Sequence, residues 1–419
     1  MKALQVGPHR IATPVVLAPM AGITNQAFRR LCREQMAGAG GEGLFVSEMV
    51  TSRALIERNA ESMRLIQHDP EENPRSVQLY GVDPATVGTC VSMLLDEDRA
   101  DHIDLNFGCP VPKVTRKGGG AALPWKSGLF AAIVGAAVKA ATPYGVPVTI
   151  KMRKGIDAEH LSYLDAGRIA EAEGVALVAL HARTAADYYG GIVDRDAIAQ
   201  LKAAVTSIPV LGNGDIWSAD DAIDMINETG CDGVVVGRGC LGRPWLFADL
   251  AAAVAGRPER VRPALGYVLA TMRRHIELLA EHYEGYERPA RSTGRSGSSG
   301  SSGGSGISGG SGSSGTEQTS ENRACRDFRK HIAWYLKGYM VGSELRSRLG
   351  LFTSLAEFDQ LTAELDADQP HPGAPAEGQR GRSGVQRQVA LPEGWLAGRE
   401  IDGATATMIR AAELSVSGG

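Results

Sequence analysis

The stretch IPVLGNGDIWSADDAIDMINETGCDGVVVGRG, residues 208–239, holds one complete strand–helix–strand unit. Its β-branched runs PVLGNG (209–214) and GVVVGRG (233–239) are apolar on both faces, which is typical of parallel strands covered by helices. The segment between them is amphipathic. It begins with Ser218, a favourable helix N-cap, and ends at Gly230, which suits the left-handed residue that closes a helix.

The same pattern recurs upstream. Six further apolar runs occur at PVVLAPM (14–20), LFVSEM (44–49), SVQLYG (76–81), HIDLNFG (102–108), VPVTIKMR (146–153) and LVALHAR (177–183). The helices between them are also signalled at their starts, by Thr24 and by the pair Asp83–Pro84. Eight such units in about 250 residues are typical of a TIM barrel. We therefore predict an α/β fold with a TIM (β/α)8 barrel over residues 1–257, and favour it over an open doubly wound sheet.

A small all-α helical domain is predicted over residues 258–366. Its amphipathic stretches are PALGYVLATMRRHIELLAEHYEG (263–285), ACRDFRKHIAWYLKGY (324–339) and SLAEFDQLTAEL (354–365). A Ser/Gly-rich segment, 291–321, interrupts this domain, and we expect a flexible loop because such residues bury little apolar surface. An engineered linker would have the same composition.

The final segment, 367–419, is rich in Pro, Gly and Arg. Because it contains few apolar residues apart from the patch VALPEGWL (389–396), we predict a disordered C-terminal tail.

Bulk properties restrict the possible classes of protein. The net charge is −4, so any site for a polyanion must be a local basic patch. The six cysteines form neither a CxxC pair nor a Cys/His cluster, which predicts free thiols in a reducing compartment and no metal site. No signal peptide and no apolar stretch of membrane-spanning length is present. We expect a cytoplasmic protein that is a monomer and binds no membrane.

Polar or turn-forming residues follow nearly every predicted strand. In a TIM barrel the catalytic groups occupy these positions, where strands end and loops begin. Polar atoms without partners are costly to bury, so packing alone does not explain them. The residues are Pro19, Met20, Ala21, Glu48, Gln78, Asn106, Cys109, Lys151, Arg153, His181, Arg183, Asn213, Gly214, Asp215, Gly237 and Arg238.

The last two units suggest an anion site. GNGD (212–215) and GRG (237–239) supply glycines whose backbone N–H groups an anion can approach closely, and Arg238 adds a positive charge. Loops seven and eight are where TIM barrels hold a phosphate. Tight turns without a ligand would show the same glycines.

Cys109 lies in the rigid turn NFGCP, just past the fourth strand. A free cysteine is commonly a small buried residue, but this position at a strand end favours a functional thiol. The following loop KVTRKGGG carries Lys113, Arg116 and Lys117 beside three glycines. That composition is typical of a mobile lid that grips an anionic substrate.

Other chemistry remains open at these strand ends. Lys151 and Arg153 alternate along one strand, so both can point into the barrel mouth. Lys151 could instead form a Schiff base, as in an aldolase, or both could be ion-paired with Glu48 or Asp215. His181 could be a general acid or a neutral hydrogen-bonding group.

Together these residues resemble the tRNA-dihydrouridine synthase family, and most closely its bacterial B-type branch. The resemblance spans about residues 8–366 apart from the Ser/Gly-rich segment. Asn25, Ala121 and Ala182 depart from the residues usual in the family. The matching stretches are LAPMAGITNQAFRRLC, VSEMV, VQLYG, IDLNFGCPVPKVTRKGGGAAL, VTIKMRKG, LHART, IPVLGNGDI, GVVVGRGCLGRPWLF and FRKHIAWYLKGY.

The resemblance implies FMN as cofactor, NADPH as reductant and tRNA as substrate. It implies that Cys109 is the general acid. The implied cofactor-binding residues are Pro19, Met20, Ala21, Gln78, Lys151, His181, Asn213, Gly214, Asp215, Gly237 and Arg238. The implied substrate-binding residues are Asn106, Lys113, Arg116, Lys151, Arg153, Arg183, Arg329, Lys330 and His331.

The implied activity is reduction of a D-loop uridine to 5,6-dihydrouridine, with hydride from reduced FMN to C6 and a proton from Cys109 to C5. Two other functions use the same barrel: an FMN-dependent oxidoreductase acting on a small molecule, and a non-catalytic RNA-binding protein.

Overall fold

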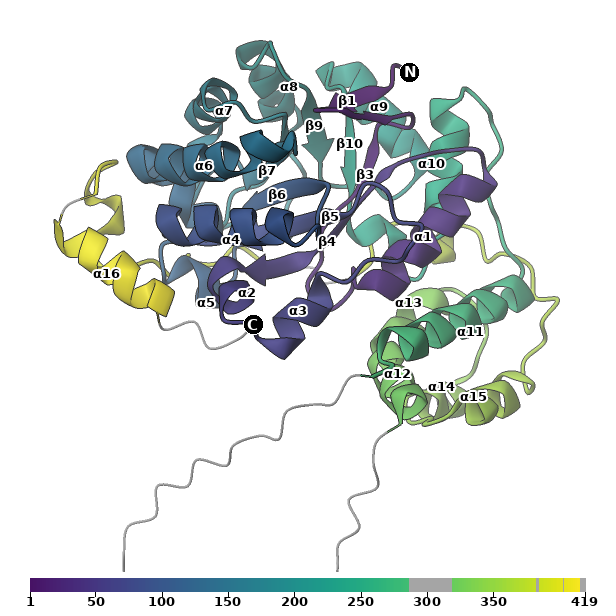
Figure 1. The fold of residues 1–419 in the computed structure, drawn as a ribbon. Helices are drawn as coiled ribbons and strands as arrows, with labels where there is room; N and C mark the ends of the chain where they lie inside the picture. The colour runs from purple at the N-terminus through teal and green to yellow at the C-terminus, as the bar shows by residue number, and fades with distance from the viewer. Residues whose placement is uncertain (286–318, 382–383, 402, 415–419) are drawn as a thin grey trace, which may run out of the picture.

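The computed structural model describes residues 1–285, 319–381, 384–401 and 403–414. Eight parallel strands form a closed barrel in the order β10-β3-β4-β5-β6-β7-β8-β9, which confirms the predicted TIM barrel (Figure 1). Closure is made by β10 and β3, where Val235 pairs with Val16. The strands are β3 (Val15–Leu17), β4 (Leu44–Thr51), β5 (Ser76–Tyr80), β6 (His102–Phe107), β7 (Val148–Arg153), β8 (Leu177–His181), β9 (Val210–Asn213) and β10 (Gly233–Val236).

Helices surround the barrel on the outside (Figure 1). The capping predictions hold for α4 and α9, where Asp83 and Ser218 accept backbone hydrogen bonds and Gly230 is left-handed with a φ of 68°. The prediction of Thr24 as N-cap was wrong: Asn25 caps α1, and the Thr24 hydroxyl accepts from Met20 N. The helices are α1 (Gln26–Gly38), α2 (Ser52–Ile56), α3 (Ala60–Leu65), α4 (Pro84–Asp96), α5 (Pro112–Thr115), α6 (Ser127–Ala141), α7 (Tyr163–Ala172), α8 (Arg195–Ala204), α9 (Ala219–Thr229) and α10 (Leu246–Val254).

An N-terminal hairpin, β1 (Leu4–Val6) and β2 (His9–Ile11), packs against the barrel interior and was not predicted. Leu4, Val6 and Ile11 join one buried cluster with inward-facing strand residues such as Val16 and Val235. The hairpin therefore covers the end of the barrel at which the strands begin, and leaves the opposite end for the site.

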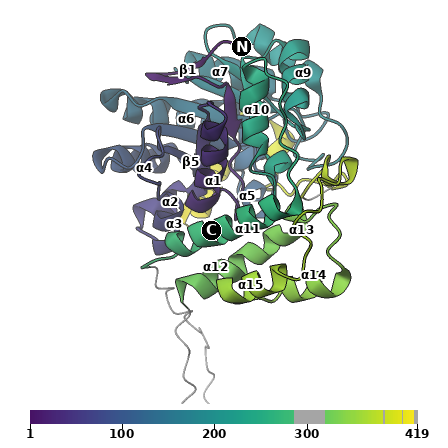
Figure 2. The same ribbon diagram turned by 90° about the vertical axis from the view of Figure 1, so that its right-hand side faces the viewer.

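A helical region follows the barrel, and its helix α11 packs against α1 (Figure 2). Its buried core includes Leu31 of α1 and Trp245, the residue before α10, so the two parts share packing. Of the expected loop 291–321, residues 291–318 lie outside the described residues. Its last three residues belong to α12 or its N-cap, Thr319. The helices are α11 (Leu265–His282), α12 (Ser320–Phe328), α13 (Ile332–Tyr335), α14 (Ser343–Leu349) and α15 (Leu355–Thr362). No described helix is both long and apolar enough to cross a membrane.

The prediction of a disordered tail over 367–419 was wrong for the residues that the structure describes. Residues 384–401 lie against the barrel, and Trp395 is only 2% exposed. A further helix, α16 (Gly403–Leu414), follows (Figure 1). Composition misled the prediction because the tail has no core of its own and instead buries its few apolar side chains against the barrel.

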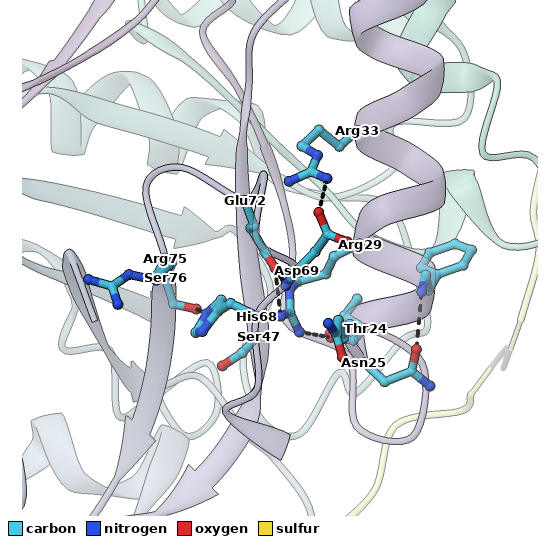
Figure 3. Close-up of polar contacts among 12 residues, drawn as sticks. Thr24, Asn25, Arg29, Arg33, Ser47, His68, Asp69, Glu72, Arg75 and Ser76 are labelled. Carbon is cyan, nitrogen blue, oxygen red and sulfur yellow. Dashed lines mark hydrogen bonds and ion pairs between the residues drawn. The ribbon is translucent and has the colours of Figure 1, made fainter. Parts of the chain in front are cut away.

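A buried ion pair fixes the loop between β3 and α1 (Figure 3). The Arg29 guanidinium, from α1, forms two hydrogen bonds to the Glu72 carboxylate and one to the Thr24 carbonyl. The side chains of Arg29 and Glu72 are 0% and 4% exposed. Since Thr24 holds the backbone of Met20, this network positions the turn after β3.

We expect Glu72→Ala to lower the free energy of unfolding by about 3–5 kcal/mol, because it leaves the buried Arg29 charge without its partner. The midpoint of urea unfolding, followed by circular dichroism, measures this loss. Glu71→Ala is the control: Glu71 is 83% exposed and 3.6 Å from Arg33, and such surface pairs contribute about 0–1 kcal/mol. Equal losses in the two variants would contradict the prediction.

Candidate active site

A chain of buried polar side chains crosses the interior beneath the barrel mouth. The Asn106 amide donates to Gln78 Oε1 at 2.8 Å, and the Gln78 amide donates to Asp104 Oδ2 at 2.7 Å. Thr149 donates to the other Asp104 oxygen at 2.6 Å. Burial raises the pKa of Asp104 to about 6, and the two hydrogen bonds oppose this rise. The chain locks Gln78 and Asn106 in place on β5 and β6.

Cys109 lies in the turn after β6 and is partly exposed, whereas the other five cysteines are buried. The Asn106 side-chain oxygen accepts hydrogen bonds from Gly108 N and Cys109 N, at 3.1 and 2.9 Å. Burial raises the pKa of the Cys109 thiol, although Arg153 and Lys151 partly offset the effect. The thiol is therefore protonated at neutral pH and sits at the rim, as a proton donor requires.

Lys151 points into the barrel, where it lines a small cavity with Pro19, Asp104 and Thr149. Burial lowers the pKa of Lys151 to about 8; the charge of Arg153 adds to this shift and Asp104 opposes it. The lysine can therefore both carry a charge and lose a proton near neutral pH.

Arg153 is 3% exposed, and its side chain holds two loops of the barrel mouth together. Its guanidinium donates to the carbonyls of Gly108, Thr184 and Tyr188 at 2.7–2.9 Å. It ties the Cys109 turn to the loop after β8. The alternative that it pairs with Glu48 or Asp215 is not seen among its described contacts.

Arg183 and Arg238 converge on one carboxylate, Asp215. Arg183 forms two hydrogen bonds to Asp215, at 2.7 and 2.9 Å, and Arg238 lies 3.8 Å away. Arg238 also stacks over the rings of Tyr189 and Trp217, at 4.6 and 5.0 Å. Both guanidinium groups lie close to Asp215, and the Nη1 atom of Arg183 has no hydrogen-bond partner in the described part of the chain. A buried guanidinium donor of this kind suits a bound anion.

The loops on either side complete this anion site. Asn213 is held by a hydrogen bond from its amide to the Val235 carbonyl at 2.6 Å. Gly214 has a φ of 126°, which a residue with a side chain rarely adopts. A Cβ on Gly237 would touch only Ala18 and Met20, at 3.6 and 3.9 Å. The glycine-rich loop therefore adjoins the turn that contains Pro19, Met20 and Ala21.

His181 is buried beneath this site. Burial lowers its pKa well below the ordinary value, and the charges of Arg153, Lys151, Arg183 and Arg238 add to the effect. A neutral histidine follows, which favours the hydrogen-bonding alternative over the general acid.

The predicted RNA-binding residues differ in exposure. Lys113, Arg116 and Lys330 are exposed. Arg329 donates to the carbonyls of Leu351 and Phe352, so it holds the helical region together.

The prediction that His331 contacts tRNA was wrong. It is 0% exposed and packs against the rings of Phe28, His275 and Phe328. Helical spacing alone did not reveal this because its burial depends on packing between the helical region and the barrel.

Sequence reasoning missed three features of the site. Asp104 was hidden inside a predicted strand, although a carboxylate within an apolar run is itself a signal. The second feature is the pair Tyr189 and Trp217, which flank Arg238, and the third is the buried Lys126. No sequence motif marks Tyr189, Trp217 or Lys126, since their roles depend on contacts between distant segments.

The fold and these side chains define a TIM-barrel protein with a candidate anion site at its last two strands and a partly exposed thiol near a buried lysine. The chain belongs to the dihydrouridine synthase family: the family model described as Dihydrouridine synthase (Dus) matches residues 16–293. The predicted resemblance is thereby confirmed.

Curated relatives agree. A probable tRNA-dihydrouridine synthase of Mycobacterium tuberculosis (strain ATCC 25618 / H37Rv) is 52% identical over 396 residues, covering 94% of this chain and 92% of the relative. The tRNA-dihydrouridine synthase B of Pseudomonas aeruginosa is 41% identical and covers 87% and 95% of the two chains. That of Xanthomonas campestris is 34% identical, with coverages of 82% and 90%.

We expect Lys151→Met to raise the thermal stability of the ligand-free protein at neutral pH, because the folded protein no longer buries a charge. Below pH 8 the lysine is charged in both the folded and unfolded chain, so the cost of burial is fully present. Between pH 8 and the ordinary pKa of 10.5 the folded protein loses its proton first, and the cost declines.

The gain in Tm should therefore shrink as pH rises from about 7 to about 10, as measured by differential scanning calorimetry. A gain that is constant across this range would contradict a titrating Lys151.

Proposed function

We propose that this protein reduces a uridine in the D-loop of tRNA to 5,6-dihydrouridine, with FMN as cofactor and Cys109 as general acid. The observation that carries the proposal is the position of Cys109: it is the one cysteine of six that is partly exposed, and it lies at the barrel mouth near Lys151. Membership of the dihydrouridine synthase family supports the reaction class.

The residues present fit FMN. The Nη1 donor of Arg183 and the nearby charge of Arg238 would bind a phosphate, with Asn213, Gly214 and Gly237 supplying the loops. Pro19, Met20 and Ala21 would lie along the ring, and Gln78, Lys151 and His181 would face its polar edge. Bound and reduced, FMN would supply hydride for C6 of the uracil.

Two side chains of the protein would stabilise the charge that develops on the uracil and supply the proton. As hydride adds to C6, negative charge develops on the O4 side of the uracil, and Lys151 is the cation suited to stabilise it. Cys109 then gives its proton to C5. A thiol with a raised pKa keeps this proton until it is needed. Asn106 and Arg153 act indirectly, because their polar atoms hold the turn of Cys109 and the neighbouring loops.

NADPH is proposed as the reductant. The sequence GRGCLG (237–242) has GxGxxG spacing and follows β10, but β10 belongs to the closed barrel, so this motif does not mark a separate dinucleotide fold. We infer that NADPH and tRNA use the same mouth in turn. We also propose that the protein acts as a monomer in the cytoplasm.

The tRNA would approach across the rim formed by the barrel and the helical region. Lys113 and Arg116 lie exposed beside Cys109, on or next to α5. Lys330 reaches from the helical region to Gly22 in the turn after β3, where an added Cβ would lie 3.8 Å from its Nζ. These cations suit a phosphate backbone, and the target base must be flipped out to reach the mouth.

The direct test is mass spectrometry of unmodified tRNA after incubation with the protein, FMN and NADPH. A gain of two hydrogens at one D-loop uridine supports the proposal. Unchanged tRNA together with reduction of a free pyrimidine would support a small-molecule oxidoreductase instead.

We expect Cys109→Ala to bind flavin and accept electrons from NADPH, but to lose at least about 10²-fold in tRNA reduction, because general acid catalysis contributes about that much or more. Flavin absorbance measures the first property and dihydrouridine content the second. Turnover at the wild-type rate would rule out the assignment of Cys109.

We expect Lys330→Ala to weaken tRNA binding. The slope of log K, the binding constant for tRNA, against the logarithm of the salt concentration should become shallower by about one, as loss of one phosphate contact predicts. Binding is measured by filter retention over a range of salt concentrations. Arg348→Ala is the matched control: both cations are exposed and ion-paired, Lys330 with Asp327 and Arg348 with Glu364, but of the two it is Lys330 that lies beside the turn after β3. Equal effects of both substitutions would contradict a specific contact at Lys330.

A further inference from the structure

Residues 384–401, which we term the clasp, run along the outer side of three consecutive active-site loops. Arg387 N donates to the Ala186 carbonyl at 2.9 Å, and the Gln386 amide donates to Asp187 at 3.1 Å, both in the loop after β8. Farther along, Val389 and Leu391 share a cavity of about 470 Å³ with Ile156, in the loop after β7. The clasp then reaches the loop after β6, which contains Cys109.

Trp395 anchors the clasp at that loop. Its indole N–H donates to the Ala122 carbonyl at 3.1 Å, and its ring lies against Gly118. Gly118 has a φ of 75°, and an added Cβ would overlap the ring. A glycine is therefore needed there both for the backbone conformation and for the close approach of the indole.

A buried lysine holds the clasp on the other side of Trp395. Lys126 is 3% exposed, and its Nζ donates to the carbonyls of Gly398 and Glu400 at 2.7 and 2.9 Å. The same Nζ lies 5.3 Å from the centre of the Trp395 ring. Arg399 adds an ion pair to Asp165 at 2.6 Å. An isolated ammonium is costly to bury, and here the clasp carbonyls supply its hydrogen-bond partners. The arrangement therefore indicates that the clasp binds at a specific position on the barrel.

The segment between Gly118 and Ala122 joins Trp395 to Cys109. Ala121 N donates to the Cys109 carbonyl at 3.1 Å. Gly120, with a φ of 54°, packs so closely on Cys109 that an added Cβ would overlap its carbonyl oxygen and lie 3.2 Å from its Cβ. One face of this segment therefore supports the candidate proton donor, and the other face rests on the tryptophan.

We propose that the clasp is part of the active site, with Trp395 as a positioning residue that fixes the loop behind the Cys109 thiol for proton transfer to the substrate. The inference rests on the proposed function. Three successive glycines, 118–120, give the unfolded loop a large conformational entropy, and contacts from outside the loop, such as that of Trp395, help to offset the cost of ordering it. A misplacement of about 1 Å at a reacting group can cost about 10²-fold in rate, so an external support has a clear use.

The test separates the two half-reactions in the full-length, FMN-loaded protein. Stopped-flow absorbance follows flavin reduction by NADPH, which needs no proton donor for uracil, and then flavin reoxidation by tRNA, which does. We expect Trp395→Ala to slow reoxidation by about 10- to 100-fold while reduction stays within about twofold. Trp395→Phe retains a ring against Gly118 but loses the N–H to Ala122, so it should fall between Trp395→Ala and the wild type.

Val385→Ser is the matched control within the clasp, because Val385 is 76% exposed. It should leave both half-reactions unchanged. Alkylation of Cys109 by iodoacetamide gives a second measurement that requires no substrate. The thiol should react faster in Trp395→Ala than in the wild type, and the five buried cysteines leave Cys109 as the main site of labelling.

Wild-type reoxidation in Trp395→Ala and Trp395→Phe would overturn the inference. Equal slowing of both half-reactions, or slowing in Val385→Ser, would also overturn it, since either result indicates general destabilisation. The proposed function fails separately, if Cys109→Ala is reoxidised by tRNA at the wild-type rate. Should Trp395→Ala not fold, the intermediate rate of Trp395→Phe still decides the question.

Discussion

The pairing of β10 with β3 closes the sheet, and the site depends on that closure. In a parallel barrel every strand ends at the same rim, so residues far apart in the chain become neighbours there. Closure places the Met20 turn next to Gly237, which is the contact between the loop expected to line a flavin ring and the loop expected to hold its phosphate. The N-terminal hairpin fills the other end of the barrel, which leaves this rim as the place for chemistry.

Much of the fold could be predicted because the barrel strands are short apolar runs with helix signals between them. Ser218 and Gly230 marked the ends of α9 correctly, since capping depends on neighbouring backbone groups. The N-terminal hairpin and the ordered tail were missed for the opposite reason. Each has few apolar residues and acquires order only by packing on a surface that other parts of the chain create, as Trp395 does.

The sequence predicted which residues gather at the candidate site, but not which of them face a ligand and which hold the loops in place. Strand-end position identified Cys109, Lys151 and Arg238, because topology brings such residues to one rim. The sequence does not separate groups that face a ligand from groups that hold the loops. Arg153 and Arg329 donate hydrogen bonds to backbone carbonyls, and His331 lies in the packed interior. Which partner each cation takes depends on desolvation and on contacts between distant loops, neither of which local spacing encodes.

The seat of Trp395 on the Cys109 loop also has a consequence for synthesis. Ala122 and Trp395 are 273 residues apart in the chain. Since ribosomes add about 5–20 residues per second, roughly 14–55 s separate the two during translation. Over that interval the nascent barrel has its thiol loop without the indole behind it. Maturation of the rim would therefore follow translation of the clasp, and a chain still being made would lack this support for its thiol loop.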